Sequence, residues 1–353
     1  MKIGILTYHD TNNYGAQLQA ASIQQFLAAE GFDAELIDFR PLRYEIRRSM
    51  PLFRALIRLN FRSFLQQARV NTHFRNAIFD MAKISKHSAF LSSQVPQIAL
   101  KYDVLICGSD ELWNFGNFRG YMSPYILDFP VKLGVRKISY AASIGPYVPS
   151  GSISKKMEAA LKQFSRILVR DPPTLELVSK FGFQADRVVD PTFLTDLNPI
   201  KPDIAPYLML SGGMTKTQVD QSLKAADILK LRPISVGVEY PGHANICVRA
   251  TPREWIGFVK HASYHITSLF HGAALSLKYE TRFCVFRTPG KEQKIMSLLE
   301  WMDASSRSID PSASGEDIAR VVSEPLSPKL PDIRDRHVSA SRDLLLSTLA
   351  GHE

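Results

Sequence analysis

Short apolar runs alternate with stretches of helical periodicity along most of the chain. Residues 2–8, 34–39 and 104–107 are predicted strands, because each is a short run of apolar and β-branched side chains. Residues 16–29 and 217–230 carry apolar side chains at the spacing of an amphipathic helix. Strand, loop, helix and strand in succession predict βαβ units and a parallel sheet. We therefore expect an α/β protein.

A chain of 353 residues is too long for one ordinary domain and suits two. The pattern predicts an N-terminal α/β domain over residues 1–198 and a C-terminal α/β domain over 199–332, joined by a proline-rich stretch. Residues 333–353 are predicted to form a C-terminal helix that bridges the two. We expect two Rossmann-like domains that face a cleft, which is a GT-B-like layout.

A basic segment at about residues 41–95 interrupts this rhythm and is predicted to be a helical insert. Between residues 40 and 94 the chain has eleven Lys and Arg against two acidic residues, and this difference equals its net charge of +9. Arg54, Arg58 and Arg62 form a stripe at helical spacing beside apolar positions. Two interpretations stay open: a helix that lies on anionic lipid headgroups, or an ordinary helix packed on the sheet with its arginines in water. No nucleic-acid-binding motif accompanies the arginines, so we expect no nucleic-acid partner.

Composition excludes several other classes of protein. No apolar run approaches the roughly 18 residues that a membrane-spanning helix needs. The first residues enter a strand at once and do not resemble a signal peptide. Cys107, Cys247 and Cys284 are far apart in the sequence, which favours a reducing compartment, and no metal-binding motif occurs. We expect a cytoplasmic protein that needs no metal and that acts at the inner face of the cell membrane.

Candidate chemistry gathers where predicted strands end, the edge at which open α/β sheets bind ligands. Asp110 follows one buried strand and can exchange a proton or orient a hydroxyl, while Gly108 permits close approach of the backbone. Arg170 ends another strand and presents a fork suited to carboxylate or phosphate. Simpler roles stay open: a helix cap for Asp110, and a salt bridge to Asp171 or a neighbouring strand for Arg170.

His271 occupies a turn between a predicted strand, residues 264–268, and a helical pattern that starts at Ala273. The first N–H groups of a helix lack partners, and its dipole is positive at that end, so such a turn attracts anions. The alternative is a helix-capping loop with one solvated histidine.

Six short stretches, taken in order, resemble the polysaccharide pyruvyl transferase family. They are Asn12–Ala20, Ile106–Asn114, Ser139–Gly145, Val169–Asp171, Asp190–Thr192 and Phe270–Gly272. The resemblance implies a two-domain GT-B-like fold. It also implies transfer of a pyruvyl group from phosphoenolpyruvate to two hydroxyls of a sugar, which yields a ketal and phosphate. Phosphoenolpyruvate is then a co-substrate, and no further cofactor is expected. Many relatives carry arginine two residues before the histidine, where this chain has Leu269.

The resemblance and the pattern together predict a role for each candidate residue. His271 is expected to deliver a proton to the methylene carbon of the donor, and Asp110 to accept the proton of a sugar hydroxyl. Donor-binding residues are predicted to be Arg170, Ser268, Phe270 and Gly272. Substrate-binding residues are predicted to be Asn13, Tyr14, Gly108 and Ser109. The acceptor is expected to be a lipid-linked oligosaccharide or a polysaccharide, and an anionic membrane surface is a further expected partner.

Two other functions fit the same pattern. A sugar-nucleotide-dependent glycosyltransferase would bind donor phosphates near Gly212 and Gly213 or near His271. A non-catalytic scaffold in polysaccharide assembly would bind neither donor. The sequence pattern carries no indication of the oligomeric state.

Overall fold

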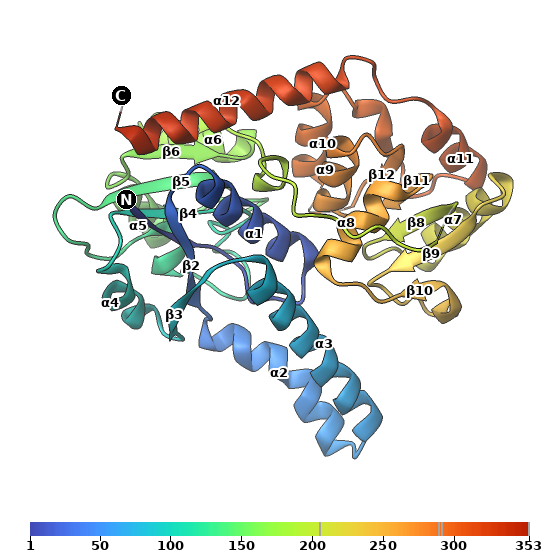
Figure 1. Cartoon of the computed structure of the whole chain (residues 1–353), viewed down its shortest axis with the longest axis horizontal. Helices are drawn as coiled ribbons and strands as arrows, with labels where there is room; N and C mark the ends of the chain where they lie inside the picture. The colour runs from blue at the N-terminus through green and yellow to red at the C-terminus, as the bar shows by residue number, and fades with distance from the viewer. Residues whose placement is uncertain (205, 289, 291, 352–353) are drawn as a thin grey trace. The chain divides into compact units, whose positions relative to one another are not determined.

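The computed structural model describes residues 1–204, 206–288, 290 and 292–351. The chain divides into two compact units, each with its own parallel sheet (Figure 1). Unit 1 comprises Met1–Thr195 and Ser341–Glu353, and unit 2 comprises Asp196–Ala340. The prediction of two parallel-sheet α/β domains is confirmed. The last two residues of the predicted C-terminal segment, 352 and 353, lie outside the described residues.

Unit 1 is built on a seven-stranded sheet in the order β3-β2-β1-β4-β5-β6-β7, with every neighbouring pair parallel. Its strands are β1 Lys2–Leu6, β2 Asp33–Phe39, β3 Ile84–Ala89, β4 Val104–Cys107, β5 Arg136–Ala142, β6 Arg166–Val169 and β7 Asp186–Arg187. Its helices are α1 Tyr14–Ala29, α2 Leu42–Ile57, α3 Phe61–Met81, α4 Val95–Ala99, α5 Gly151–Leu161 and α6 Pro172–Lys180.

Unit 2 is built on a six-stranded sheet in the order β10-β9-β8-β11-β12-β13, again parallel throughout. Its strands are β8 Tyr207–Ser211, β9 Arg232–Val236, β10 Cys247–Val248, β11 Tyr264–Thr267, β12 Phe283–Phe286 and β13 Ser308–Ile309. Its helices are α7 Lys216–Ile228, α8 Pro252–His261, α9 Phe270–Lys278, α10 Glu292–Trp301 and α11 Gly315–Ser323.

The order of strands reverses beside the first strand of each sheet. In unit 1 the chain builds outward from β1 to β3 and then restarts with β4 on the other side of β1. In unit 2 the same reversal lies between β8 and β11. Ligands of open α/β sheets bind outside the carboxyl ends of the strands at this reversal. The loops after β1, β4, β8 and β11 therefore lie where a ligand is expected.

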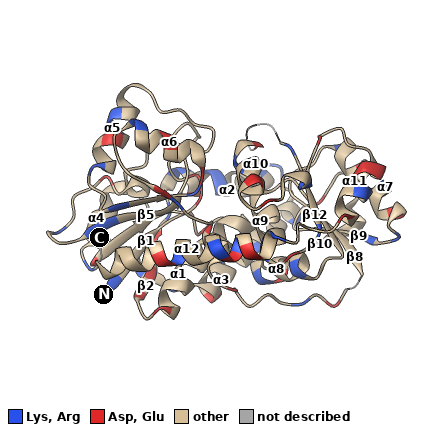
Figure 2. Cartoon of the chain, turned by 90° about the horizontal axis from the view of Figure 1, so that it is seen from above, with Lys and Arg blue, Asp and Glu red and all other residues tan. Residues whose placement is uncertain are grey.

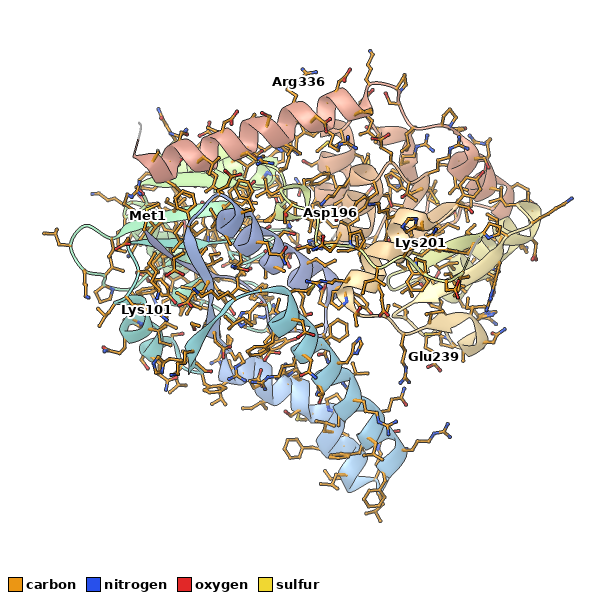
Figure 3. The ribbon with its side chains drawn as sticks, viewed as in Figure 1. Met1, Lys101, Asp196, Lys201, Glu239 and Arg336 are labelled. Carbon is orange, nitrogen blue, oxygen red and sulfur yellow. The ribbon has the colours of Figure 1, made fainter. Side chains whose placement is uncertain are left out.

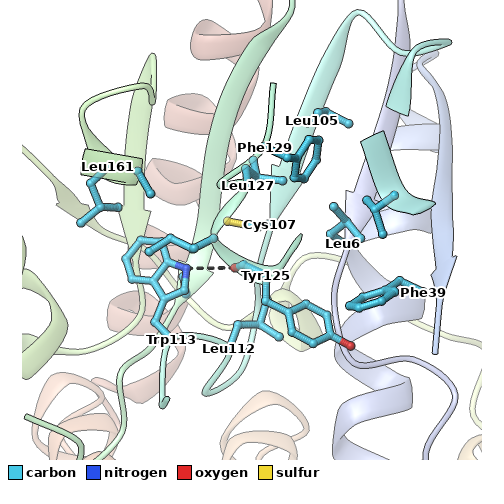
Figure 4. Packing of buried hydrophobic residues seen from close by; sticks show 14 of the residues in the cluster. Leu6, Phe39, Leu105, Cys107, Leu112, Trp113, Tyr125, Leu127, Phe129 and Leu161 are labelled. Carbon is cyan, nitrogen blue, oxygen red and sulfur yellow. Dashed lines mark hydrogen bonds between the residues drawn. The ribbon is translucent and has the colours of Figure 1, made fainter. Parts of the chain in front are cut away.

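The core of unit 1 anchors the loop that follows β4 (Figure 4). Leu112 and Trp113 are fully buried in this core. The indole Nε1 of Trp113 donates a hydrogen bond of 3.1 Å to the carbonyl of Tyr125, and its backbone N–H donates to the carbonyl of Ser143. An apolar anchor thus holds the loop that carries Asp110 against the sheet.

The predicted helical insert at residues 41–95 is only partly helical. Helices α2 and α3 occupy its first part, but β3 then pairs in parallel with β2 at the edge of the sheet. The prediction missed this strand because most of its side chains are exposed or half-exposed, so it lacks the apolar run of a central strand. The pair of long helices therefore ends at Met81, and a short 3-10 helix, Ser92–Gln94, follows the strand.

The last strand of unit 1 is Asp186–Arg187, and Asp190 then caps a short 3-10 helix, Pro191–Phe193. Helix α9 begins at Phe270, three residues before the predicted start, and Leu269 occupies its N-cap position.

Helix α12, Leu330–Ala350, begins in unit 2 and ends in unit 1. Its side chains carry both charges along its length (Figure 2). In unit 2 the His337 ring lies 4.3 Å from the Trp301 ring, centroid to centroid. In unit 1 the Ser341 hydroxyl accepts a hydrogen bond of 3.0 Å from the backbone N–H of Val189. The predicted C-terminal helix thus has contacts in each unit.

A buried histidine ties β11 to its neighbours in unit 2. The Nε2 of His265 lies 2.8 Å from the Ser211 hydroxyl on β8, and its Nδ1 lies 2.8 Å from the Ser276 hydroxyl on α9. Burial lowers the pKa of His265 to about 3. The ring is therefore neutral at pH 7, and its two nitrogens link strand β11 to strand β8 and to helix α9.

This histidine should make the protein less stable as the pH falls. Between pH 6.5 and about 3 the unfolded chain binds a proton at His265 that the folded chain does not, so protons favour unfolding. We expect a loss of about 2 kcal/mol in the free energy of unfolding between pH 7 and pH 5 from this group. Urea denaturation of the wild type and of His265→Gln measures it, with the exposed His87→Gln as control. Equal losses in the wild type and His265→Gln would contradict the assignment.

Candidate functional site

Asp110 lies at the strand reversal of unit 1, directly beyond β4. Its backbone is in the left-handed region with φ +76°, and its carbonyl accepts hydrogen bonds from the N–H groups of Leu112 and Ser143. Gly108 has φ +124°, and a Cβ there would come within 2.0 Å of the Tyr140 carbonyl oxygen. Only glycine fits this approach. The loop therefore holds the Asp110 carboxylate at the carboxyl edge of the sheet, where 19% of the side chain is exposed.

Arg170 lies behind Asp110 and is almost completely buried, with 4% of its side chain exposed. Its Nη1 donates a hydrogen bond of 3.0 Å to Asp190 Oδ2, and its Nη2 lies 3.5 Å from Asp110 Oδ1. Burial alone would lower the pKa of Arg170, but the attraction of nearby carboxylates, Asp110 first, outweighs burial and raises it. Of the two interpretations open for Arg170, the structure shows the ion pair. A direct contact with a donor stays a prediction.

Asp190 lies at the centre of this network, although no role was predicted for it from the sequence. Its side chain is fully buried. One carboxylate oxygen accepts from Arg170 and from the Ser109 hydroxyl, and the other accepts from the backbone and hydroxyl of Thr192. Its motif, Asp190–Thr192, was visible in the sequence, but Ser109 and Arg170 belong to loops far away along the chain.

The other predicted residues of unit 1 have structural contacts. Asn13 caps helix α1, because its side chain accepts a hydrogen bond of 3.2 Å from the backbone of Ala16. The Tyr14 ring packs 4.9 Å from the Phe74 ring, centroid to centroid. Ser109 is buried, and its hydroxyl donates to Asp190. Asn13 is exposed and Tyr14 half-exposed, so both remain accessible to a ligand.

A second polar cluster, also missed, lies beyond the ends of β1 and β2. Asp10 Oδ1 accepts a hydrogen bond of 2.7 Å from Arg48 on α2, and the guanidinium of Arg119 stacks 4.2 Å from the centre of the Tyr8 ring. Tyr8, Asp10 and Arg119 help to line a cavity of about 10 Å³, room for about one water molecule. Within the described part of the chain, the buried Asp10 Oδ2 and Thr11 Oγ1 that line this cavity have no hydrogen-bond partner. The cavity therefore suits one hydroxyl group of a ligand.

His271 lies in the first turn of α9, at the strand reversal of unit 2. Its ring is half-buried and stands edge-on to Phe270, with ring centres 5.2 Å apart. The N–H groups of residues 270–272 open the helix and are the donors that such a terminus offers to an anion. The predicted histidine, helix terminus and strand end are thus together within one unit.

The loops around His271 pack too closely for larger side chains. A Cβ on Gly272 would come within 2.2 Å of the Thr267 hydroxyl, and one on Gly212 within 2.4 Å of the Ser268 hydroxyl. The Ser268 hydroxyl donates a hydrogen bond of 3.0 Å to the carbonyl of Gly213. The loop after β8 therefore lies directly beside the loop after β11. No cluster of three or more metal-ligating side chains occurs among residues that the structure describes.

Comparison with known proteins defines the family. The sequence matches the polysaccharide pyruvyl transferase family over residues 13–289, which is most of the chain. The chain belongs to this family. The match spans Asp110, Arg170 and His271, and it ends before helix α12. No curated protein shows significant sequence similarity to this chain.

Solved structures show the fold of this pyruvyl transferase family member. A putative UDP-N-acetylglucosamine 2-epimerase from Listeria monocytogenes is 10% identical with a TM-score of 0.54, over 99% of this chain and 96% of that one. The UDP-GlcNAc 2-epimerase from Methanocaldococcus jannaschii is also 10% identical with a TM-score of 0.54, over 99% and 100% of the two chains. These likenesses confirm the predicted GT-B-like architecture and concern the fold alone.

Asp190 should contribute strongly to the stability of unit 1. Asp190→Ala removes the carboxylate that is hydrogen-bonded to the buried guanidinium of Arg170. Breaking a buried ion pair in this way costs about 3–5 kcal/mol. We expect a loss of that size in the free energy of unfolding, measured by urea denaturation. The control is Asp186→Ala, which removes a half-exposed pair with Arg166 and should cost less than about 1 kcal/mol. Similar losses in the two variants would show that the Asp190 network is not stabilising.

Proposed function

We propose that this protein transfers the pyruvyl group of phosphoenolpyruvate to two hydroxyls of a carbohydrate. Family membership supports the reaction class. The observation that carries the proposal for this chain is the place of His271, in the first turn of a helix at the strand reversal of unit 2. A half-buried imidazole beside helix N–H groups suits a donor that is both anionic and in need of a proton.

The proposed reaction balances without an oxidant or reductant. A proton adds to the methylene carbon of phosphoenolpyruvate, and a sugar hydroxyl oxygen bonds to the adjacent carbon as it gives up its own proton. The bond between that carbon and the phosphate oxygen then breaks. A second hydroxyl of the sugar takes the place of the phosphate, and its proton leaves with the phosphate. The products are a cyclic pyruvyl ketal and inorganic phosphate.

In unit 2, His271 delivers the proton and helix α9 holds the anionic groups of the donor. Ser268, Phe270 and Gly272 shape this helix terminus. Leu269 provides no charge where many relatives have arginine, but the ammonium group of Lys294 on α10 lies 5.9 Å from the centre of the Phe270 ring. We assign to Lys294 the charge that Leu269 does not supply. The proposal needs no metal ion or other cofactor.

In unit 1, Asp110 accepts the proton of the sugar hydroxyl. The support is its exposure at the carboxyl edge and the loop that fixes its backbone. Arg170 orients the carboxylate from behind, and Asp190 holds Arg170 in place. Asn13 and Tyr14 lie at the same edge and contribute to binding of the sugar, while Gly108 and Ser109 shape the loop.

We further propose that the acceptor is a lipid-linked oligosaccharide at the inner face of the cell membrane. Carbohydrate repeat units that carry a lipid are held at a membrane surface, and the basic insert of unit 1 fits that location.

Substitution of the two proposed proton carriers should abolish most turnover. We expect His271→Asn and Asp110→Asn each to lower kcat by about 10²- to 10⁴-fold, because each removes a general acid or base. Phosphate release from phosphoenolpyruvate, measured with candidate oligosaccharides as acceptors, gives the rate. His243→Asn and Asp186→Asn, which change the same residue types at exposed or half-exposed ion pairs, are matched controls. Turnover near the wild-type rate in His271→Asn would refute its role.

Binding of the donor separates the three candidate functions. We expect calorimetry to detect phosphoenolpyruvate binding. Lys294→Gln should weaken it by about tenfold to a hundredfold, the contribution of one charge-assisted contact. Lys329→Gln, an exposed lysine of the same unit, should bind as the wild type does. Binding of UDP-sugars instead would favour a glycosyltransferase, and binding of neither would favour the scaffold.

A further inference from the structure

Helices α2 and α3 form a hairpin that projects from unit 1 (Figure 1). Its base is anchored: Phe74, Ala77, Ile78 and Met81, all at the end of α3, are buried. Arg48, near the middle of α2, pairs with Asp10 in the loop after β1. Its far end is a turn over residues 58–60, where the Asn60 side chain caps α3 through the N–H of Ser63.

The far end of this hairpin exposes large apolar side chains (Figure 3). Within α2 only Ala55 is buried, so this helix does not pack on the sheet. Ile57 is 81% exposed and Leu59 75%. Seven of the nineteen large apolar side chains that are exposed in the described structure lie here: Met50, Phe53, Leu56, Ile57, Leu59, Phe61 and Leu65. We call these seven residues the apolar tip.

Basic side chains surround the apolar tip. Arg54, Arg58, Arg62 and Arg69 are all exposed, and the chain has no acidic residue between positions 50 and 69. Across the described residues, none of these four arginines has an ion pair with a carboxylate. A surface that is both apolar and uniformly basic is costly to leave in water, and it matches a partner that is both apolar and anionic.

Leu59 adds to the apolar tip in an unfavourable backbone conformation. It has φ +50°, a conformation that costs a leucine about 1–2 kcal/mol and that glycine or asparagine adopts more readily. The turn would be more stable with either of those residues. An exposed leucine at this position weakens the fold and adds apolar surface at the end of the hairpin, which is expected where the surface itself is used.

We propose that the hairpin is a membrane-docking element that inserts its apolar tip between the headgroups of an anionic lipid bilayer. The arginines bind the lipid phosphates while the apolar side chains enter the acyl region. None of the helices described is long and apolar enough to cross a membrane, so the hairpin lies in the interface. The contact between Arg48 and Asp10 then ties the docked hairpin to a loop at the strand reversal of unit 1.

A second copy of the chain fits the apolar tip less well than a membrane does. A symmetric dimer through the two tips would bring the same arginines face to face without carboxylates to neutralise them. An anionic bilayer supplies both the negative charge and the apolar medium. The proposal concerns this surface alone and holds whichever reaction the protein catalyses.

Vesicle flotation of the full chain tests the proposal. We expect binding to vesicles of phosphatidylcholine mixed with phosphatidylglycerol, and little binding to phosphatidylcholine alone. The triple variant Arg54→Gln, Arg58→Gln, Arg62→Gln should bind anionic vesicles about a hundredfold more weakly, since each basic side chain at such a surface contributes about fivefold. Ile57→Ser with Phe61→Ser should bind at least about tenfold more weakly, because apolar burial is lost.

Leu59→Asn distinguishes docking from folding. It should unfold at the same or a higher urea concentration than the wild type and still bind vesicles more weakly. Two matched controls on unit 1 should bind as the wild type does. They are the charge control Lys132→Gln, Lys155→Gln, Lys162→Gln and the apolar control Leu133→Ser, Val148→Ser, all at exposed positions.

Three outcomes would overturn the proposal. The first is no binding of the wild type to anionic vesicles. The second is equal losses in the charge variant and its lysine control, which would indicate general charge attraction. The third is a wild-type dimer in solution that becomes monomeric in Ile57→Ser with Phe61→Ser, which would assign the apolar tip to a second copy of the chain.

Discussion

The reversal of strand order beside the first strand of each sheet is the constraint on which the rest of the structure depends. Parallel strands need crossover helices, and a chain that builds outward from its first strand must return to build the other side. The loops on either side of the reversal turn away from one another, so the carboxyl edge stays open there. Asp110 in unit 1 and His271 in unit 2 both occupy that position in their own sheets. The backbone topology alone therefore places both candidate residues at the edge where a ligand is expected.

Burial separates the ionisable groups of the two units into two kinds. Fully buried groups stabilise the structure, and partly exposed groups stay accessible to a ligand. In unit 1 the carboxylate of Asp190 and the guanidinium of Arg170 are removed from water and satisfy one another, whereas Asp110 at the same network keeps access to solvent. In unit 2 the buried His265 is held neutral between two hydroxyls, whereas His271, six residues on, is half-buried at a helix terminus. Each unit thus pairs a group that stabilises the loop with one that can reach a ligand.

Local patterns in the sequence were sufficient to predict the two parallel sheets, the place of Asp110 and His271 at strand ends, and the family. They could not predict contacts between distant segments. The carboxylate partners of Arg170, Asp110 and Asp190, come from two different loops, so its burial was not visible, and Asp190 received no role. Strand β3 escaped because an edge strand lacks the apolar run of a buried one. For the basic insert, periodicity left two interpretations open, and the exposure of α2 excludes packing on the sheet.

The most direct test of the proposed reaction follows the proton and the pyruvyl group together. The purified protein is mixed with phosphoenolpyruvate and a candidate oligosaccharide in deuterated water, and the product is examined by nuclear magnetic resonance. Our account predicts a ketal methyl group that carries one deuterium, with one phosphate released for each ketal, because solvent-derived hydrogen adds to the methylene carbon. A product without a pyruvyl methyl group, or one formed only when a sugar nucleotide is supplied, would contradict it.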